Sequence, residues 1–245
     1  MTGDSVERAL ADHTWTSVPS RPLVLVPIGS TEQHGPHLPL DTDTAIASAV
    51  TEGVAAQIGG DVLVAPSLSY GSSGEHQSFA GTSSIGTDVL QGTVIELVRS
   101  MSTWAGRIVF VNAHGGNVSA LAKAVSQLLS EQHTVGWVPC ATEDVDLHAG
   151  FTETSLMLHL RPGSVRLDQA EPGDTRPIAE IMPLLVQGGV AAVSANGVLG
   201  DPRGATAAQG ERVLAVMVAD VLERIRLGAA DPRGMLVRAS AKVTS

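Results

Sequence analysis

Short apolar runs alternate with segments of helical periodicity along most of this chain. Residues 23–28 are continuously apolar, and similar runs occupy residues 62–65, 108–111 and 135–138. Continuous apolar runs of this length are typical of strands that are buried on both faces of a parallel sheet. The sequence therefore predicts four core strands.

Between and after these runs, apolar side chains recur at the spacing of amphipathic helices. The pattern predicts helices at residues 42–58, 88–104, 118–129, 152–160 and 205–226. Gly59 and Gly60 are expected to end the first helix, and Thr87 is the expected N-cap of the second. Residues 162–203 are rich in glycine and proline, so we expect loops with short elements there.

Strands that alternate with helices predict right-handed βαβ units, and hence an α/β fold with a mostly parallel sheet and helices on both faces. With 245 residues, the chain is expected to form one domain. Its core would span about residues 23–226, between a polar N-terminal segment and a loose C-terminal tail. In such folds, ligands bind beyond the carboxyl ends of the strands.

Carboxylates and imidazoles gather where the predicted strands end. The side chains concerned are Glu32, His34, Asp43, His114, His148 and Glu153. Because the carboxyl ends of parallel strands meet at one edge of a sheet, we expect these side chains to converge. Taken one at a time, each has a simpler interpretation as a solvated carboxylate or an ordinary loop histidine, and only their joint position indicates a site.

The residue types favour a metal site. Mixed nitrogen and oxygen ligands suit Zn²⁺, Fe²⁺ or Mn²⁺ better than Ca²⁺, and Asp43 offers two oxygens that could bridge two ions. A water between two such ions becomes a strong nucleophile near neutral pH, so the predicted chemistry is hydrolysis of an amide. His148 is the predicted acid for the departing nitrogen, because an imidazole titrates near neutral pH.

Three further polar residues are expected near the site without binding an ion. His37 is suited to brace its loop by donating to a backbone carbonyl, whereas Glu75 and His76 are suited to line the pocket or to support the ligands. The chain contains no phosphate-binding Gly-x-x-x-x-Gly-Lys loop, no His-Glu-x-x-His helix and no Gly-x-Ser-x-Gly elbow.

Composition excludes several classes of partner. The formal net charge of −10 and the lack of a basic run argue against nucleic acid. Hydrophobic residues make up 43% of the chain, but no apolar stretch is long enough to cross a bilayer, so no membrane association is expected. A single cysteine, Cys140, and an N-terminus without a signal-like apolar core predict a cytoplasmic protein.

Three motifs resemble those of the creatininase family of amidohydrolases. They are Gly-Ser-Thr-Glu-Gln-His-Gly-Pro-His-Leu-Pro-Leu from residue 29 with an Asp at 43, Asn-Ala-His-Gly-Gly-Asn from residue 112, and His-Ala-Gly with Glu-Thr-Ser from residue 148. The resemblance spans residues 23–225. It implies a three-layer αβα sandwich, a homo-oligomeric ring such as a hexamer, and two divalent ions per subunit, either Fe²⁺ or Zn²⁺, with Mn²⁺ as a further option. The family's metal ligands correspond here to Glu32, His34, Asp43, His114 and Glu153.

Residues 70–82, 188–194 and 198–202 are similar to a peptidase branch of that family. Membership of the branch would imply release of a C-terminal Val-Tyr dipeptide from a decarboxylated ribosomal precursor peptide during the biosynthesis of a redox cofactor. The alternative is hydrolysis of a small cyclic amide or formamide, which would use the same metal ligands. A third reading, a metal-binding scaffold without catalysis, would not need His148.

Two departures from the creatininase pattern weigh against creatinine as the substrate. Creatininases carry a metal-binding Glu two residues after the histidine of the second motif, whereas this chain has Gly116, so Glu153 is expected to complete the second ion's ligands. Creatininases also line their pocket with tryptophans. Trp104 and Trp137 fall at a predicted helix end and inside a predicted strand, where we expect them to pack in the core.

Overall fold

A four-stranded parallel sheet forms the centre of the structure, a computed structural model that describes residues 8–141 and 146–238. The strand order is β2-β1-β3-β4, and every pair of neighbours is parallel. The strands are β1 (Leu23–Ile28), β2 (Val62–Val64), β3 (Arg107–Asn112) and β4 (Val135–Pro139). The predicted parallel sheet is confirmed.

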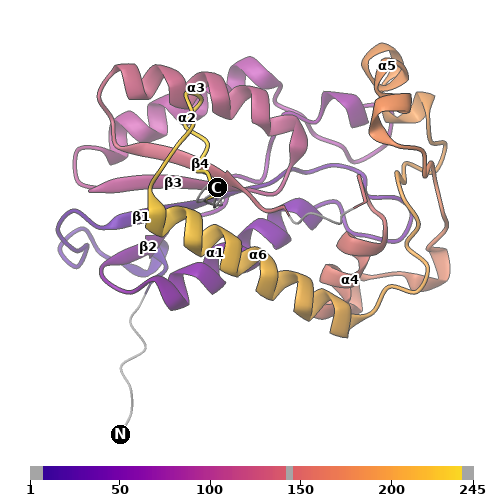
Figure 1. Ribbon diagram of the computed structural model, residues 1–245, viewed down its shortest axis with the longest axis horizontal. Helices are drawn as coiled ribbons and strands as arrows, with labels where there is room; N and C mark the ends of the chain where they lie inside the picture. Colours follow the sequence, from indigo (N-terminus) through magenta and orange to yellow (C-terminus); the bar gives the residue numbers. More distant parts are fainter. Residues whose placement is uncertain (1–7, 142–145, 239–245) are drawn as a thin grey trace, which may run out of the picture.

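Helices cover both faces of this sheet, with α2 and α3 on one side and α1 and α6 on the other (Figure 1). The α-helices are α1 (Thr42–Ile58), α2 (Thr87–Met101), α3 (Val118–Ser130), α4 (Phe151–Leu160), α5 (Ile178–Gly188) and α6 (Ala207–Leu227). Short 3-10 helices lie between them: η1 (Leu10–Asp12), η2 (Gly74–His76), η3 (Gly115–Asn117), η4 (Pro162–Ser164), η5 (Leu167–Gln169) and η6 (Val190–Ala192). The three-layer αβα sandwich is therefore confirmed. Within the described ranges, no helix combines the length and the apolar character needed to span a bilayer.

Each face of the sheet packs into its own apolar cluster, because successive strand residues point to opposite faces. Phe110 and Trp137 are buried on the side of α2 and α3, and Trp104 packs against that cluster. Val109 and Val111 are buried on the side of α1 and α6. The expected core positions of the two tryptophans are confirmed.

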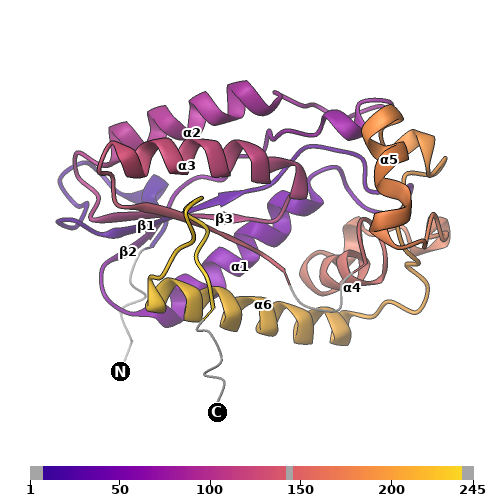
Figure 2. The same cartoon turned by 45° about the horizontal axis from the view of Figure 1, so that its top comes forward.

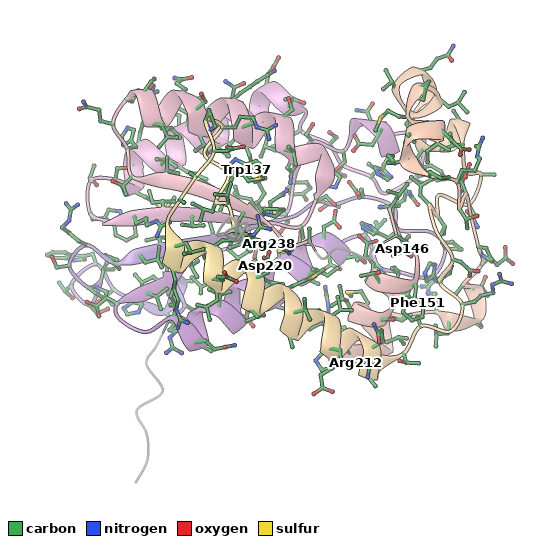
Figure 3. All side chains as sticks on the ribbon, in the orientation of Figure 1. Trp137, Asp146, Phe151, Arg212, Asp220 and Arg238 are labelled. Atoms are coloured by element: carbon green, nitrogen blue, oxygen red, sulfur yellow. The ribbon has the colours of Figure 1, made fainter. Side chains whose placement is uncertain are left out.

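The segment at residues 228–238 is not the loose tail that was expected. It returns to the sheet beside β4, where Leu236 N donates to Trp137 O at 2.8 Å and Trp137 N donates to Gly234 O at 3.0 Å. Leu236 is only 2% exposed, and Arg238 pairs with Asp220 of α6 at 2.5 Å (Figure 3). The segment after the last helix therefore covers the outer edge of the sheet at β4. The terminal residues 1–7 and 239–245, parts of the predicted N-terminal segment and tail, lie outside the described residues.

At the opposite edge, the N-terminal segment covers β2. Val64 N donates to Arg8 O at 2.7 Å, and Ala9 pairs with Val64 in a parallel bridge.

Two local predictions were wrong. Helix α2 begins at Thr87 and its N-cap is Gly86, because the Thr87 hydroxyl bonds the Ser72 hydroxyl at 2.9 Å instead of capping the helix. Helix α5 is regular over eleven residues in a region where only loops and short elements were expected. Pro183 lies inside α5 and hid its helical pattern.

Candidate metal centre

The loop after β1 buries two of the predicted ligands. Glu32 N donates to Leu40 O at 2.9 Å, and His34 pairs with Leu38 in an antiparallel bridge, so the loop folds back on itself. Glu32 and His34 are both fully buried. The loop thus holds a carboxylate and an imidazole at the carboxyl end of the sheet.

Asp43 lies in the first turn of α1, directly beside this loop. Ser30 Oγ donates to Asp43 Oδ2 at 2.8 Å and fixes the carboxylate. At Gly29 an added Cβ would collide with the backbone of Thr44, so glycine permits the close approach of α1 to the end of β1. The turn of α1 that carries Asp43 is therefore pressed against the loop that carries Glu32.

His114 enters from the end of β3. Asn117 Nδ2 donates to Gly29 O at 2.9 Å and ties the loops after β1 and β3 together. The ring of His114 places Nε2 at 3.1 Å from the Ser72 carbonyl, which can only accept a hydrogen bond. Nε2 therefore donates to Ser72, and Nδ1 points at Asp43.

Asp43 lies between the two predicted histidine ligands. Its Oδ1 is 3.1 Å from His34 Nε2, and its Oδ2 is 3.1 Å from His114 Nδ1. On the other side of His34, Glu153 Oε2 lies 3.8 Å from Nε2 and accepts from Ala149 N at 2.6 Å. The carboxylate of Asp43 thus has the placement that bridging two ions requires.

Three sets of side chains in the described residues present donor atoms close enough to share an ion. They are Glu32 with Asp43 and His114, His34 with His148 and Glu153, and Glu32 with His76 and His148. The first two sets together contain all five predicted ligands. We call Glu32, His34, Asp43, His114 and Glu153 the candidate metal centre.

The electrostatics of this centre favour a cation. Both carboxylate oxygens of Glu32 are buried without a hydrogen-bond partner. Burial, and then the charge of Asp43, raise the pKa of Glu32 to about 7. Burial likewise raises the pKa of Glu153 to about 7. Since buried carboxylates are costly unless they are paired, a divalent ion between Glu32 and Glu153 would stabilise their charged forms.

The carboxylates of the centre raise the pKa values of its two histidines, His34 and His114. Burial alone would lower the pKa of His34, but the carboxylates around it, led by Asp43, raise it to about 10. In the same way Asp43 and Glu32 overcome the burial of His114 and raise its pKa to about 9. The reciprocal effect holds the pKa of Asp43 well below its usual range, although burial opposes it.

Ion binding is therefore expected to release protons and to weaken as the pH falls. At pH 7 the pKa of about 10 at His34 and about 9 at His114 keep both rings charged, and each must lose a proton to donate its lone pair. Calorimetric titration with Zn²⁺ in buffers of different ionisation enthalpy should report release of about three protons, one from each ring and about half a proton from each of Glu32 and Glu153, whose pKa values lie at about 7. Binding without proton release would contradict this assignment of ligands.

Comparison with known proteins assigns the chain to a family. The profile of the Creatininase family, described as creatinine amidohydrolase, matches residues 11–225. The chain belongs to the creatininase family.

Individual relatives agree with this assignment. A protein of Mycolicibacterium smegmatis named mycofactocin precursor peptide peptidase is 56% identical over 219 residues, which cover 88% of this chain and 89% of that protein. A crystal structure of creatinine amidohydrolase aligns with a TM-score of 0.75 and 28% identity, covering 91% of this chain and 98% of that one. A creatininase variant described as Zn-Zn type aligns with a TM-score of 0.73 and 28% identity, covering 89% and 97% of the two chains. Creatininases are metal-dependent hydrolases of C–N bonds, and so is this member of the family.

His148, the predicted acid of this creatininase-family site, lies at its edge. Its Nδ1 is 3.8 Å from Glu32 Oε1, and its ring lies 4.3 Å from that of His34. Burial holds the pKa of His148 well below its ordinary value, so the ring is neutral in the metal-free protein. The structure brings His148 to the site, and its role as an acid stays a prediction.

Of the three residues expected around the ligands, Glu75 and His76 line the cavity at the site, whereas His37 contacts α4. His76 Nε2 is 3.4 Å from Glu32 Oε1, and burial lowers the pKa of His76 to about 3. His37 does not donate to a backbone carbonyl as expected. Its Nε2 lies 2.9 Å from the Thr154 hydroxyl, which connects the loop after β1 to α4.

The structure explains why residue 116 is a glycine in this member of the creatininase family. A Cβ at this position would clash first with the backbone carbonyl of Ser72, and would lie 2.5 Å from His114 Nε2 and 2.7 Å from Glu75 Oε1. The carboxylate of Glu75 is itself 3.7 Å from His114 Nε2. Glu75 thus occupies the space into which a side chain at residue 116 would extend, and any larger residue there would displace it.

A cavity of about 660 Å³ opens from the candidate metal centre. One wall carries its carboxylates and imidazoles, and the other is apolar. The apolar wall consists of Leu147, Ile178, Met182, Leu185, Val186, Val190 and Leu199. No lysine or arginine occurs among the described residues that line this cavity. Sequence reasoning missed the apolar wall because it missed α5, which lies at the same end of the molecule as α4 (Figure 2).

Proposed function

We propose that this protein is a metal-dependent peptidase that removes the C-terminal Val-Tyr dipeptide from the modified mycofactocin precursor peptide during redox cofactor biosynthesis. Support comes from the high identity to a relative that carries the name of such a peptidase. The shape of the cavity supports the same conclusion.

The apolar wall of the cavity carries the proposal. A volume of about 660 Å³ lies in the range of pockets that enclose ligands much larger than creatinine. The wall offers side chains of Ile178, Met182 and Leu185 to bulky apolar groups such as those of valine and tyrosine. Because no basic side chain lines the described cavity, a free C-terminal carboxylate would lack a partner among the side chains, whereas a decarboxylated end would need none.

The donor set fits two divalent ions. Glu32, Asp43 and His114 would hold one, and His34, Asp43 and Glu153 would hold the other, with Fe²⁺, Zn²⁺ and Mn²⁺ all compatible with these donors. Such ions supply Lewis acidity to the scissile carbonyl and lower the pKa of water.

The protein's own groups move the proton and place the peptide. His148 Nδ1 faces Glu32 and the cavity, so it is placed to take a proton from the attacking water and to pass it to the departing nitrogen. The apolar wall holds the side chains that flank the scissile bond and excludes bulk water.

The homo-oligomeric ring, the cytoplasmic location and the single-domain organisation stay predictions.

Cleavage of matched peptides tests the function. A peptide that ends in Val-Tyr with a decarboxylated terminus should lose the dipeptide in the presence of metal-loaded protein, as mass spectrometry would show, and a chelator should abolish the reaction. The same peptide with a free C-terminal carboxylate should react at least about tenfold more slowly, because desolvating an unpaired charge costs more than about 1.4 kcal/mol. Failure to cleave either peptide, by protein that hydrolyses small cyclic amides or formamides, would favour the alternative.

A further inference from the structure

Gln33 lies between His76 and His148, two histidines that flank the candidate metal centre but are not among its five residues. The residue is buried, and its Oε1 accepts from Gly35 N at 2.8 Å. Its Nε2 donates to Gly197 O at 3.0 Å. A backbone N–H can only donate and a backbone carbonyl can only accept, so these two contacts fix which end of the carboxamide is oxygen and which is nitrogen.

The backbone of Gln33 determines where His148 carries its hydrogen. His148 Nε2 is 2.9 Å from the carbonyl oxygen of Gln33, which can only accept. Nε2 therefore bears the hydrogen and cannot also accept from the Gln33 amide nitrogen, which is 3.1 Å away. In the neutral ring, Nδ1 then carries the lone pair, on the side that faces Glu32 Oε1.

The side chain of Gln33 determines the opposite arrangement at His76. The amide nitrogen Nε2 of Gln33 has two hydrogens, one of which is directed at Gly197 O. The other is directed at His76 Nδ1, at 2.8 Å. His76 Nδ1 must therefore be the acceptor, which leaves the hydrogen of the ring on Nε2, 3.4 Å from Glu32 Oε1.

We propose that Gln33 is a positioning residue that fixes opposite tautomeric roles on two adjacent histidines, so that His76 presents an N–H and His148 presents a lone pair to the same carboxylate, Glu32. The centroids of the two rings lie 4.4 Å apart, with the ring planes tilted by 44°. As long as His76 Nδ1 accepts from Gln33, its Nε2 keeps the hydrogen and has no lone pair to offer an ion. The set of Glu32, His76 and His148 is thereby closed to a third ion, and His76 becomes a hydrogen-bond donor at the edge of the cavity.

The tautomers can be read directly. In full-length metal-free protein with ¹⁵N-labelled histidine, long-range ¹H–¹⁵N correlations should show His76 with its hydrogen on Nε2, its signals being identified by their loss in His76→Gln. Gln33→Glu, whose carboxylate can only accept, should move that hydrogen to Nδ1. Gln57→Glu, an exposed change of the same kind on α1, should leave it in place. An Nδ1–H tautomer of His76 in the unmodified protein would overturn the proposal, as would an unchanged tautomer in Gln33→Glu.

A second measurement needs no variant. Titration of the unmodified protein with Zn²⁺, which is diamagnetic, should shift the signals of His34 and His114 and leave the Nε2–H of His76 present. Loss of that hydrogen on zinc binding would show that His76 is a ligand and would contradict the role given to Gln33. The role of the pair in turnover rests on the proposed function, but neither readout depends on the identity of the substrate. A failure of the peptide assay would therefore leave this test intact.

Discussion

Replacement of Asp43 by asparagine is expected to release both divalent ions and to lower peptide turnover by at least about a thousand-fold. Each oxygen of Asp43 faces one of the two histidines of the candidate metal centre, at 3.1 Å in both cases. An amide offers one neutral oxygen in place of the two oxygens of a charged carboxylate, so the two ions would lose the ligand that they share and the negative charge that attracts both. Metal ions supply several kcal/mol of stabilisation to such transition states, and each 1.36 kcal/mol is a factor of ten.

The matched control for this variant is Asp41→Asn. Asp41 immediately precedes α1 and pairs with Arg161 at 3.0 Å, with both side chains largely exposed. Exposed pairs of this kind contribute about 0–1 kcal/mol, so metal content and turnover should stay unchanged. Elemental analysis of both purified variants decides the matter, since two retained ions in Asp43→Asn would refute the bridging role.

His148→Gln is expected to keep the metal content and to lower kcat by about 10²–10⁴-fold, the usual contribution of a positioned acid or base. Glutamine is close to histidine in size and can still donate to the Gln33 carbonyl, which His148 contacts at 2.9 Å. It has no group of suitable pKa to carry a proton between water and the leaving nitrogen. Steady-state kinetics together with elemental analysis would separate the two effects.

His159→Gln supplies the control for that variant, because His159 is an exposed residue of the last turn of α4. It should match the unmodified protein in both measurements. A His148→Gln protein that had lost an ion would instead make His148 a ligand together with His34 and Glu153, which is the second of the sets described above.

The fold could be predicted because parallel strands buried on both faces read as continuous apolar runs, whatever the rest of the chain does. Helix α5 could not be predicted, because Pro183 interrupts the helical pattern of residues 178–188. In addition, the apolar side chains of α5 line a cavity instead of packing in the core. The return of residues 228–238 to the sheet was missed for a related reason. Only two apolar residues, Met235 and Leu236, anchor it, too few to give a period.

The convergence of the side chains of the candidate metal centre could be predicted because the carboxyl ends of parallel strands meet at one edge of the sheet, and their role as ligands stays a prediction. The position of Glu75 could not be predicted, since it depends on the absent side chain of Gly116, which is far away in sequence. The contacts of Gln33 were equally hidden. They involve Gly197 and His148, whose approach to the loop after β1 exists only in the folded chain.

Both outer strands of the sheet are occupied by the chain's own ends, Arg8 and Ala9 at β2 and residues 234–236 at β4. Unpaired strand edges invite pairing with other chains and so promote aggregation. Here the backbone hydrogen-bonding groups at Val64 and Trp137 are already paired, so copies of the protein cannot join by extending their sheets at these points. Removal of residues 8–9 or of residues 234–236 would leave these backbone groups unpaired and would create a strand edge prone to aggregation.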